Sequence, residues 1–122
     1  AIMFASHHNL DNLNLIVDNN RISMLDHTDN IVSHSDLSKR FSSFGWDCKE
    51  IDGHDVIAIQ SALLKQKNTR DGKPKVIIAS TLKGRGVPGL QDVPLSHIIN
   101  PKPELIESLL EKLAVKLLEK EG

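Results

Sequence analysis

The chain alternates between short, mostly apolar runs and longer segments in which apolar residues recur at helical spacing. The apolar runs occupy residues 13–17 and 75–80, and turn-forming polar residues follow each of them. Runs of this kind are typical of strands that are buried on both faces of a sheet. Polar and apolar residues alternate over most of residues 46–51, which predicts a further strand that comes between the other two along the chain. The pattern therefore predicts three short strands.

Helical patterns fill the segments around these strands. They occupy residues 1–8, 37–44, 56–67 and 104–120. Ser35 is predicted to cap the second helix with Asp36 in its first turn, and Gly45 is predicted to end it. Asp55 is predicted to cap the third helix. The larger apolar residues of that helix lie roughly on one face: Ile57, Ile59, Leu63 and Leu64. Because strands and helices alternate through short turns, we predict an α/β fold, a parallel sheet with flanking helices.

Polar residues follow two of the predicted strands. Residues 18–20 (DNN) follow the first strand, and residues 80–86 (STLKGRG) end and follow the third. The carboxyl ends of parallel strands meet at one edge of a sheet, so both segments are expected at that edge. Side-chain oxygens suit a hard cation such as Mg²⁺, and a lysine with permissive glycines suits a phosphate. Each segment alone is also typical of an ordinary turn, but together they favour a diphosphate with Mg²⁺ as the ligand.

Composition and charge exclude several classes of function. The 122 residues carry a net charge of −1 and no basic stripe of the kind that binds nucleic acid. No apolar run approaches the roughly 20 residues that cross a bilayer, so we expect no membrane association. The single cysteine, Cys48, lies inside a predicted strand. We expect it to be a small buried residue of a cytoplasmic protein.

Several segments together resemble the amino-terminal, diphosphate-binding domain of transketolases. The segments are 5–13 (ASHHNLDNL), 15–23 (LIVDNNRIS), 44–46 (FGW), 51–55 (IDGHD) and 80–87 (STLKGRGV). They occur in the family's order and at similar spacing, and the resemblance covers residues 1 to 97. It implies a thiamine diphosphate-binding fold that is truncated at its N-terminal side. Residues 1–122 would then be the C-terminal portion of that domain.

The resemblance also implies roles for individual residues. Asn20 matches the asparagine whose side-chain oxygen binds Mg²⁺ (or Ca²⁺), and Ile22 matches the position that offers its backbone carbonyl to the same ion. Lys83 matches a lysine near the cofactor. His97 resembles the histidine that contacts the diphosphate and helps to handle the substrate in catalysis. Amide and carbonyl oxygens suit a hard cation, and a lysine and a histidine suit diphosphate oxygens.

The implied parent enzyme transfers a two-carbon ketol unit between sugar phosphates, as in the pentose phosphate pathway, using thiamine diphosphate and a divalent metal. We expect its partners to be a pyrimidine-binding domain or subunit of the same enzyme, in a dimer or other homo-oligomer. The family's Gly-Asp-Gly metal motif would lie before Ala1, and the activating glutamate belongs to another domain. We therefore expect this chain alone to be inactive, and to self-associate through an exposed sheet edge or apolar face.

Two alternatives remain open at this point. The parent could be another thiamine diphosphate enzyme, such as deoxyxylulose-phosphate synthase or a dehydrogenase E1 component, although the segment from Lys83 to His97 favours transketolase. The chain could instead be a non-catalytic structural subunit. Arg21 and the Ser96-His97-Ile98 context, where the family usually has Trp-His-Gly, give that interpretation its weight.

Overall fold

The computed structural model describes residues 1–87, 89–98 and 100–121. It divides into two compact units, each of which is described by itself. The sheet unit consists of Ala1–Asn20 and His34–Thr81, and the loop unit consists of Arg21–Ser33 and the chain from Leu82 onward. No helix of the described residues has both the length and the apolar character needed to cross a membrane.

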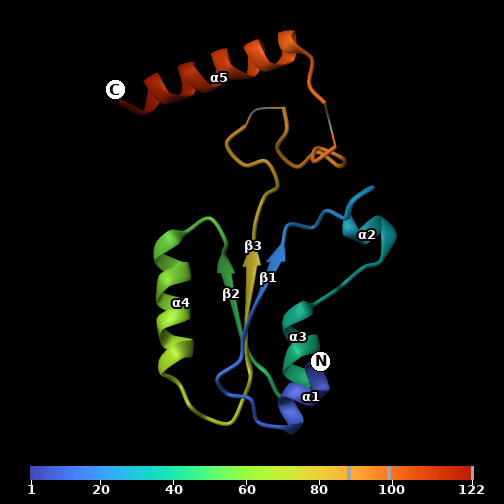
Figure 1. Ribbon diagram of the computed structural model, residues 1–122, viewed down its shortest axis with the longest axis vertical. Helices are drawn as coiled ribbons and strands as arrows, with labels where there is room; N and C mark the ends of the chain where they lie inside the picture. Colours follow the sequence, from blue (N-terminus) through green and yellow to red (C-terminus); the bar gives the residue numbers. More distant parts are fainter. Residues whose placement is uncertain (88, 99, 122) are drawn as a thin grey trace. The chain divides into compact units, whose positions relative to one another are not determined.

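A parallel sheet of three strands forms the centre of the sheet unit. The strands are β1 (Asn14–Asn19), β2 (Asp47–Asp52) and β3 (Lys75–Ser80), and their order in space is β1-β3-β2. Figure 1 shows the three arrows pointing the same way, with β3 between the others. The predicted strands and the predicted α/β fold with flanking helices are confirmed, and β1 continues to Asn19, two residues beyond the predicted end.

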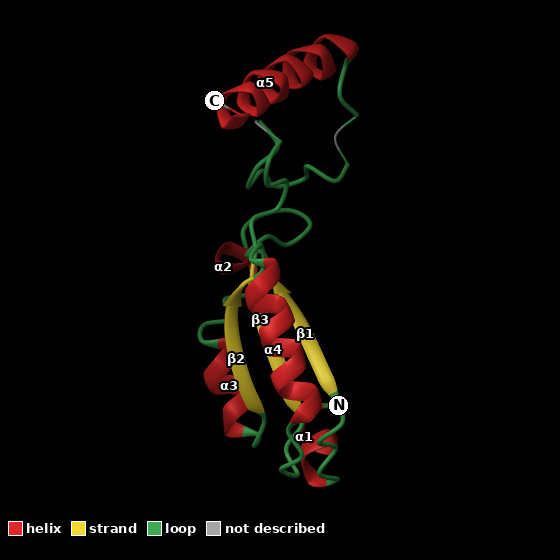
Figure 2. Cartoon of the chain, turned by 90° about the vertical axis from the view of Figure 1, so that its left-hand side faces the viewer, coloured by secondary structure: helices red, strands yellow, loops and turns green. Residues whose placement is uncertain are grey.

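Helices cover both faces of this sheet. Helices α1 (Ile2–His7) and α3 (Leu37–Ser43) lie on one face, and α4 (Val56–Asn68) lies on the other (Figures 1 and 2). The core on the α1 and α3 side consists of Ala5, Phe41, Trp46, Val76 and Ile78, with Cys48 packed against it. β3 is buried because both of its edges are paired and both of its faces are covered, which explains its continuous apolar run.

The start of α3 differs from the prediction. The cap is Asp36, whose side chain accepts a hydrogen bond from the backbone N–H of Lys39 at 2.9 Å. Ser35 lies one residue before the cap and has a positive φ of 46°. The aspartate caps because its carboxylate also interacts favourably with the positive end of the helix dipole. The predicted stop at Gly45 agrees with its φ of 82°, a conformation that glycine adopts readily.

Most of the apolar face predicted for α4 is exposed rather than packed on the sheet. Ala62 and Gln66 are buried, whereas Ile57 is 74% exposed and Leu64 is 52% exposed. The small side chain of Ala62 suits a helix that lies close against the strands. Ile59 is half-buried, whereas the other large apolar residues of the predicted face are exposed. Helical periodicity predicts which residues share one face of a helix, but it does not predict which element that face contacts.

The cap of α4 is as predicted and gives a test of local stability. One carboxylate oxygen of Asp55 accepts hydrogen bonds from Ile57 N at 2.9 Å and Ala58 N at 3.0 Å. Replacing Asp55 with alanine should lower the free energy of unfolding by about 1 kcal/mol, measured by urea titration, because two N–H groups lose their acceptor. Asp55→Asn is the matched control and should keep most of the stability. Equal losses in both variants would contradict this role.

The loop unit has two helices, and its other described residues form turns and irregular segments. It contains the short α2 (Thr28–Ile31), which the sequence pattern did not predict, and α5 (Pro103–Glu121), which it did. Leucines recur every four residues along α5, and of these Leu109 is buried and Leu105 is 42% exposed. The side chain of Leu117 lies outside the described residues. Leu109 lies near the backbone of Gly89, where an added Cβ would come 3.6 Å from Leu109 Cδ2.

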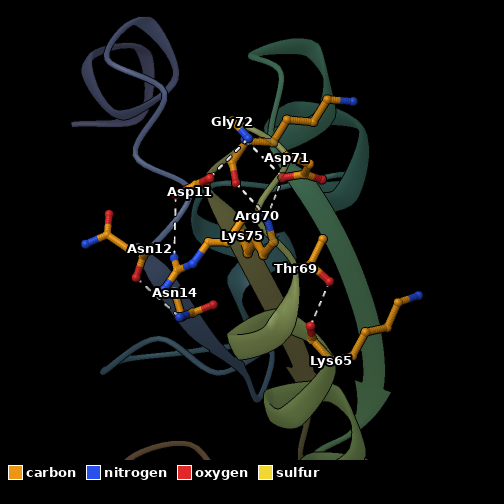
Figure 3. Close-up of polar contacts among 10 residues, drawn as sticks. Asp11, Asn12, Asn14, Lys65, Thr69, Arg70, Asp71, Gly72 and Lys75 are labelled. Atoms are coloured by element: carbon orange, nitrogen blue, oxygen red, sulfur yellow. Dashed lines mark hydrogen bonds and ion pairs between the residues drawn. The ribbon is translucent and has the colours of Figure 1, made fainter.

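A charged side chain is fully buried at the start of β3. Lys75 has no exposed side-chain surface, and its Nζ lies 2.6 Å from Asp71 Oδ1 and 2.8 Å from the carbonyl of Lys73 (Figure 3). Asp11 ties the same loop to the segment after α1, because it accepts from Gly72 N at 3.3 Å and pairs with Arg70 at 3.5 Å. The loop before β3 is thus fixed by polar contacts at the amino edge of the sheet.

Acid should weaken the fold partly through Asp71. The hydrogen bond from Lys75 is the main cause that lowers the pKa of this carboxyl below its ordinary value of 3.8. Such a group stabilises the fold above pH 3.8 and loses this contribution as the pH falls through its lower folded pKa. We therefore expect Asp71→Asn to flatten the acid side of a stability curve, measured by urea unfolding at a series of pH values. An unchanged acid slope would contradict this assignment.

The two outer strands present unpaired edges within the described residues. The burial on both faces predicted for the strand at residues 13–17 is wrong, because β1 contains no buried residue. Ile16 is 56% exposed and Leu15 is 36% exposed. Exposed apolar residues on an unpaired parallel edge are unusual in an isolated domain. The predicted exposure of a sheet edge is therefore confirmed, and the self-association expected from it remains a prediction.

Candidate functional site

The carboxyl ends of the three strands meet at one edge of the sheet. Asn19 and Asp52 both lie level with Ser80 in the parallel register, as predicted for the segments that follow the strands. Thr81 Oγ1 donates to Asp18 Oδ1, and the backbone N–H of Thr81 donates to the carbonyl of Asn19 at 3.4 Å. Side chain and backbone together join the ends of β1 and β3.

Asn20 lies directly beside this junction. Its Nδ2 donates to Asp18 Oδ2 at 3.4 Å, so the carboxylate of Asp18 accepts from both Asn20 and Thr81. The sequence analysis placed Asp18 and Thr81 in the two candidate segments but gave an individual role only to Asn20. Their contact depends on the register between β1 and β3, and only the pairing of the strands reveals it.

The end of β2 approaches the same junction through a glycine. Gly53 N donates to the carbonyl of Ser80 at 2.8 Å, and an added Cβ on Gly53 would come 2.4 Å from Thr81 Cγ2. Asp52 Oδ1 accepts from His54 N at 2.8 Å, which closes the turn predicted at this position. A side chain at position 53 would therefore push Thr81 away from the end of β1.

Ile22 belongs to a small hairpin in the loop unit. It forms an antiparallel bridge with His27, flanked by hydrogen bonds from Ser23 N to Asp26 O at 2.8 Å and from Thr28 N to Arg21 O at 2.9 Å. In this type of pair, the bridged residues direct their own N–H and C=O groups away from each other. The Ile22 carbonyl thus points out of the hairpin, and Arg21 before it has a φ of 58°.

Lys83 and His97 come together within the loop unit. Lys83 Nζ lies 3.0 Å from His97 Nδ1, across the loop that joins them. An ammonium group can only donate, so Nδ1 is the acceptor and the ring proton lies on Nε2. The Lys83 carbonyl accepts from Asp92 N at 2.8 Å, which closes this loop at its base. The two residues predicted to contact a diphosphate are therefore neighbours.

The four predicted site residues form separate groups in the structure. Asn20 belongs to the sheet unit, and Ile22, Lys83 and His97 belong to the loop unit. Within the described part of the chain, no three His, Cys, Asp or Glu side chains gather closely enough to hold a metal ion. The donors available to a cation at the predicted positions are therefore an amide oxygen and a main-chain carbonyl, both of which suit Mg²⁺ or Ca²⁺.

A cleft of about 510 Å³ lies elsewhere in the sheet unit, between β2 and α4. Gln66 lines it, and Oε1 of this buried side chain has no hydrogen-bond partner among the described residues. None of the four predicted site residues lines this cleft. Within the sheet unit, the candidate site is therefore the carboxyl edge of the sheet rather than this cleft.

Known proteins are similar to this chain in sequence and in fold. The family described as "Transketolase, thiamine diphosphate binding domain" matches residues 1–117. A transketolase-like protein 2 from Mus musculus is 40% identical over 80% of this chain, which corresponds to 15% of the mouse protein. One of the subunits of an apulose-4-phosphate transketolase from Actinobacillus succinogenes is 33% identical over 93% of this chain and 40% of its own length. The chain thus spans less than half of either relative.

Solved structures agree with these sequence relationships. A transketolase from Campylobacter jejuni superposes on 78% of this chain and 15% of its own, with 33% identity and a TM-score of 0.71. A transketolase variant from Pichia stipitis superposes on 93% of this chain and 17% of its own, with 27% identity and a TM-score of 0.75. The chain therefore belongs to the transketolase family, in the part described as the thiamine diphosphate-binding domain.

Proposed function

We propose that this chain holds the diphosphate end of thiamine diphosphate, through a divalent cation, in an enzyme that transfers a two-carbon ketol unit between sugar phosphates. The observation that carries the proposal is the meeting of β1 and β3 at the carboxyl edge, with Asn20 beside the junction. Ligands of open parallel sheets bind at this edge. The membership of the family supplies the cofactor class.

The donor set fits this ligand. The side-chain oxygen of Asn20 and the carbonyl of Ile22 would hold Mg²⁺ or Ca²⁺, since both are uncharged oxygen donors. Lys83 and His97 would contact the diphosphate, with the ammonium donating charge-assisted hydrogen bonds to its oxygens. When bound, thiamine diphosphate supplies the nucleophilic carbon and the electron sink for ketol transfer. The share of this chain is to bind and orient, so the reacting carbon is held in one position.

We also propose that the other half of the cofactor site comes from a pyrimidine-binding domain or subunit. Two relatives named as transketolase subunits support this division. One is the apulose-4-phosphate transketolase subunit described above, and the other is a 6-deoxy-6-sulfo-D-fructose transketolase subunit from Clostridium sp., 34% identical over all of this chain. This chain spans 40% and 42% of those subunits, respectively. Without such a partner, we expect this chain to show no ketol transfer.

Calorimetric titration with thiamine diphosphate, with and without Mg²⁺, tests the proposal. Binding should require Mg²⁺, and Asn20→Ala should weaken it by at least about tenfold, because a direct ligand matters no less than the residues that support one. Asn14→Ala is the matched control. Asn14 is an exposed asparagine at the opposite end of the same strand, and its replacement should leave binding unchanged.

Three results would argue against this function. Binding that is independent of Mg²⁺ would remove the cation from the site. Equal losses in the Asn20 and Asn14 variants would indicate a general effect on β1. No binding at all, in a chain whose circular dichroism shows the folded sheet unit, would contradict the proposal that this chain alone holds the diphosphate.

A further inference from the structure

The carboxylate of Asp18 occupies a specific place at the carboxyl edge. Asp18 is the residue before the last of β1, and its two oxygens have different partners. Oδ1 accepts from the hydroxyl of Thr81, and Oδ2 accepts from Nδ2 of Asn20 at 3.4 Å. The side chain therefore lies between the residue after β3 and the residue after β1.

The chemistry of these groups determines which way the Asn20 amide faces. An ionised carboxylate can only accept hydrogen bonds, whereas a side-chain amide has one donating and one accepting end. The NH₂ end of Asn20 must therefore face Asp18, and Oδ1 must face away from it. Reversing the amide would place two acceptors against each other, which is unfavourable.

Thr81 makes this orientation more specific. Its hydroxyl donates to Oδ1 of Asp18, and this contact limits rotation of the carboxylate about the Cβ–Cγ bond. Thr81 is itself positioned, because its backbone N–H donates to the Asn19 carbonyl and the nearby Gly53 leaves room for its side chain. The orientation of Asn20 thus depends on the pairing of β1 with β3.

We propose that Asp18, held by Thr81, is a positioning residue that turns the carbonyl oxygen of Asn20 toward the divalent cation. This inference rests on the proposed function, since it concerns the same cation. Asp18 acts through Asn20 and is not itself a ligand. A cation at this point would then meet an amide oxygen that is already oriented. This lowers the entropic cost of ordering the Asn20 side chain when the cation binds.

A double-mutant cycle tests this role against direct coordination. Asp18→Asn replaces the carboxylate with a group that can also donate, so the residue at position 18 no longer favours one orientation of the Asn20 amide. We expect the Mg²⁺ concentration needed for thiamine diphosphate binding to rise about tenfold, as for other residues that support a metal ligand. The same change made in an Asn20→Ala chain should add little, because the residue through which Asp18 acts is already gone. Asp47→Asn, at the amino end of β2, is the matched control.

The second measurement reports on the amide itself and needs no activity. In a ¹⁵N-labelled chain, the side-chain NH₂ signals of Asn20 should shift when Asp18 is replaced with asparagine, and shift less in Thr81→Val. Saturating Mg²⁺ should restore thiamine diphosphate affinity in Asp18→Asn, which a general loss of folding would not allow.

The outcomes separate this inference from the proposed function. If the unaltered chain does not bind thiamine diphosphate with Mg²⁺, the proposed function fails and takes the metal-directed role of Asp18 with it. If binding is normal but the effects of the Asp18 and Asn20 replacements simply add, Asp18 acts independently and the inference is wrong. Unchanged Asn20 NH₂ signals in Asp18→Asn would also overturn it.

Discussion

Replacing Trp46 with alanine is expected to lower the free energy of unfolding of the sheet unit by about 3–5 kcal/mol. The indole is 6% exposed and lies edge-on to Phe41, with ring centroids 5.4 Å apart. Its Nε1 also donates to the carbonyl of Ile2 at 3.1 Å, which ties α1 to the start of β2. Because small domains are stable by only about 5–15 kcal/mol, a loss of this size is a large part of the total.

Two further variants separate the contributions to this effect. Trp46→Phe keeps an aromatic ring against Phe41 but removes the hydrogen bond to Ile2, so we expect an intermediate loss. Val56→Ala removes apolar atoms from a side chain that is 76% exposed and should change stability little. Urea unfolding followed by circular dichroism measures all three. A loss below about 1 kcal/mol in Trp46→Ala would mean that the indole is not part of the packed core.

Replacing Gly84 with alanine should disrupt the loop that brings Lys83 to His97. Gly84 has a φ of 71°, and a Cβ there would come 2.5 Å from the carbonyl oxygen of Leu90. The positive φ alone costs an alanine about 1 kcal/mol. The clash is with backbone rather than with a flexible side chain, so the loop must move. We expect faster tryptic cleavage after Lys83 and Arg85, and weaker binding of thiamine diphosphate.

Gly86→Ala is the matched control for this experiment. Gly86 has a φ of 92°, but an added Cβ would meet no heavy atom within 4 Å. It therefore reports the cost of the backbone conformation without the steric clash. We expect it to show a small part of the effect of Gly84→Ala. Equal cleavage rates in the two alanine variants would show that the contact with Leu90 is unimportant.

The sequence predicted the elements of the sheet unit well because local patterns dominate there. The apolar run that forms β3 and the cap at Asp55 depend on neighbours in the chain, and both are confirmed. The buried Lys75 could not be predicted, since a lysine at the start of a strand is normally exposed. Its burial depends on Asp71 and the carbonyl of Lys73, which only the folded loop brings to it.

In the candidate site, too, the sequence identifies some residues, whereas contacts between distant segments become visible only in the fold. Asn20, Lys83 and His97 could be named because their segments resemble a known family, and the structure adds the close pair formed by the latter two. No individual role could be assigned to Asp18 or Thr81, since their contact joins a residue of β1 to the residue that follows β3. The roles of Asn20, Ile22, Lys83 and His97 toward metal and cofactor stay predictions until binding is measured.

The position of β3 in the sheet has a consequence for the order of folding. β3 is the last of the three strands along the chain, yet it is the only neighbour of both β1 and β2 within this sheet. During synthesis, neither of the earlier strands can complete its backbone pairing until residues Lys75–Ser80 have emerged. Contacts between residues so distant in sequence form slowly. The edge of β1 that pairs with β3 must therefore stay unpaired through that interval. Unpaired strand edges make nascent chains prone to aggregation, which is one reason that chaperones assist folding.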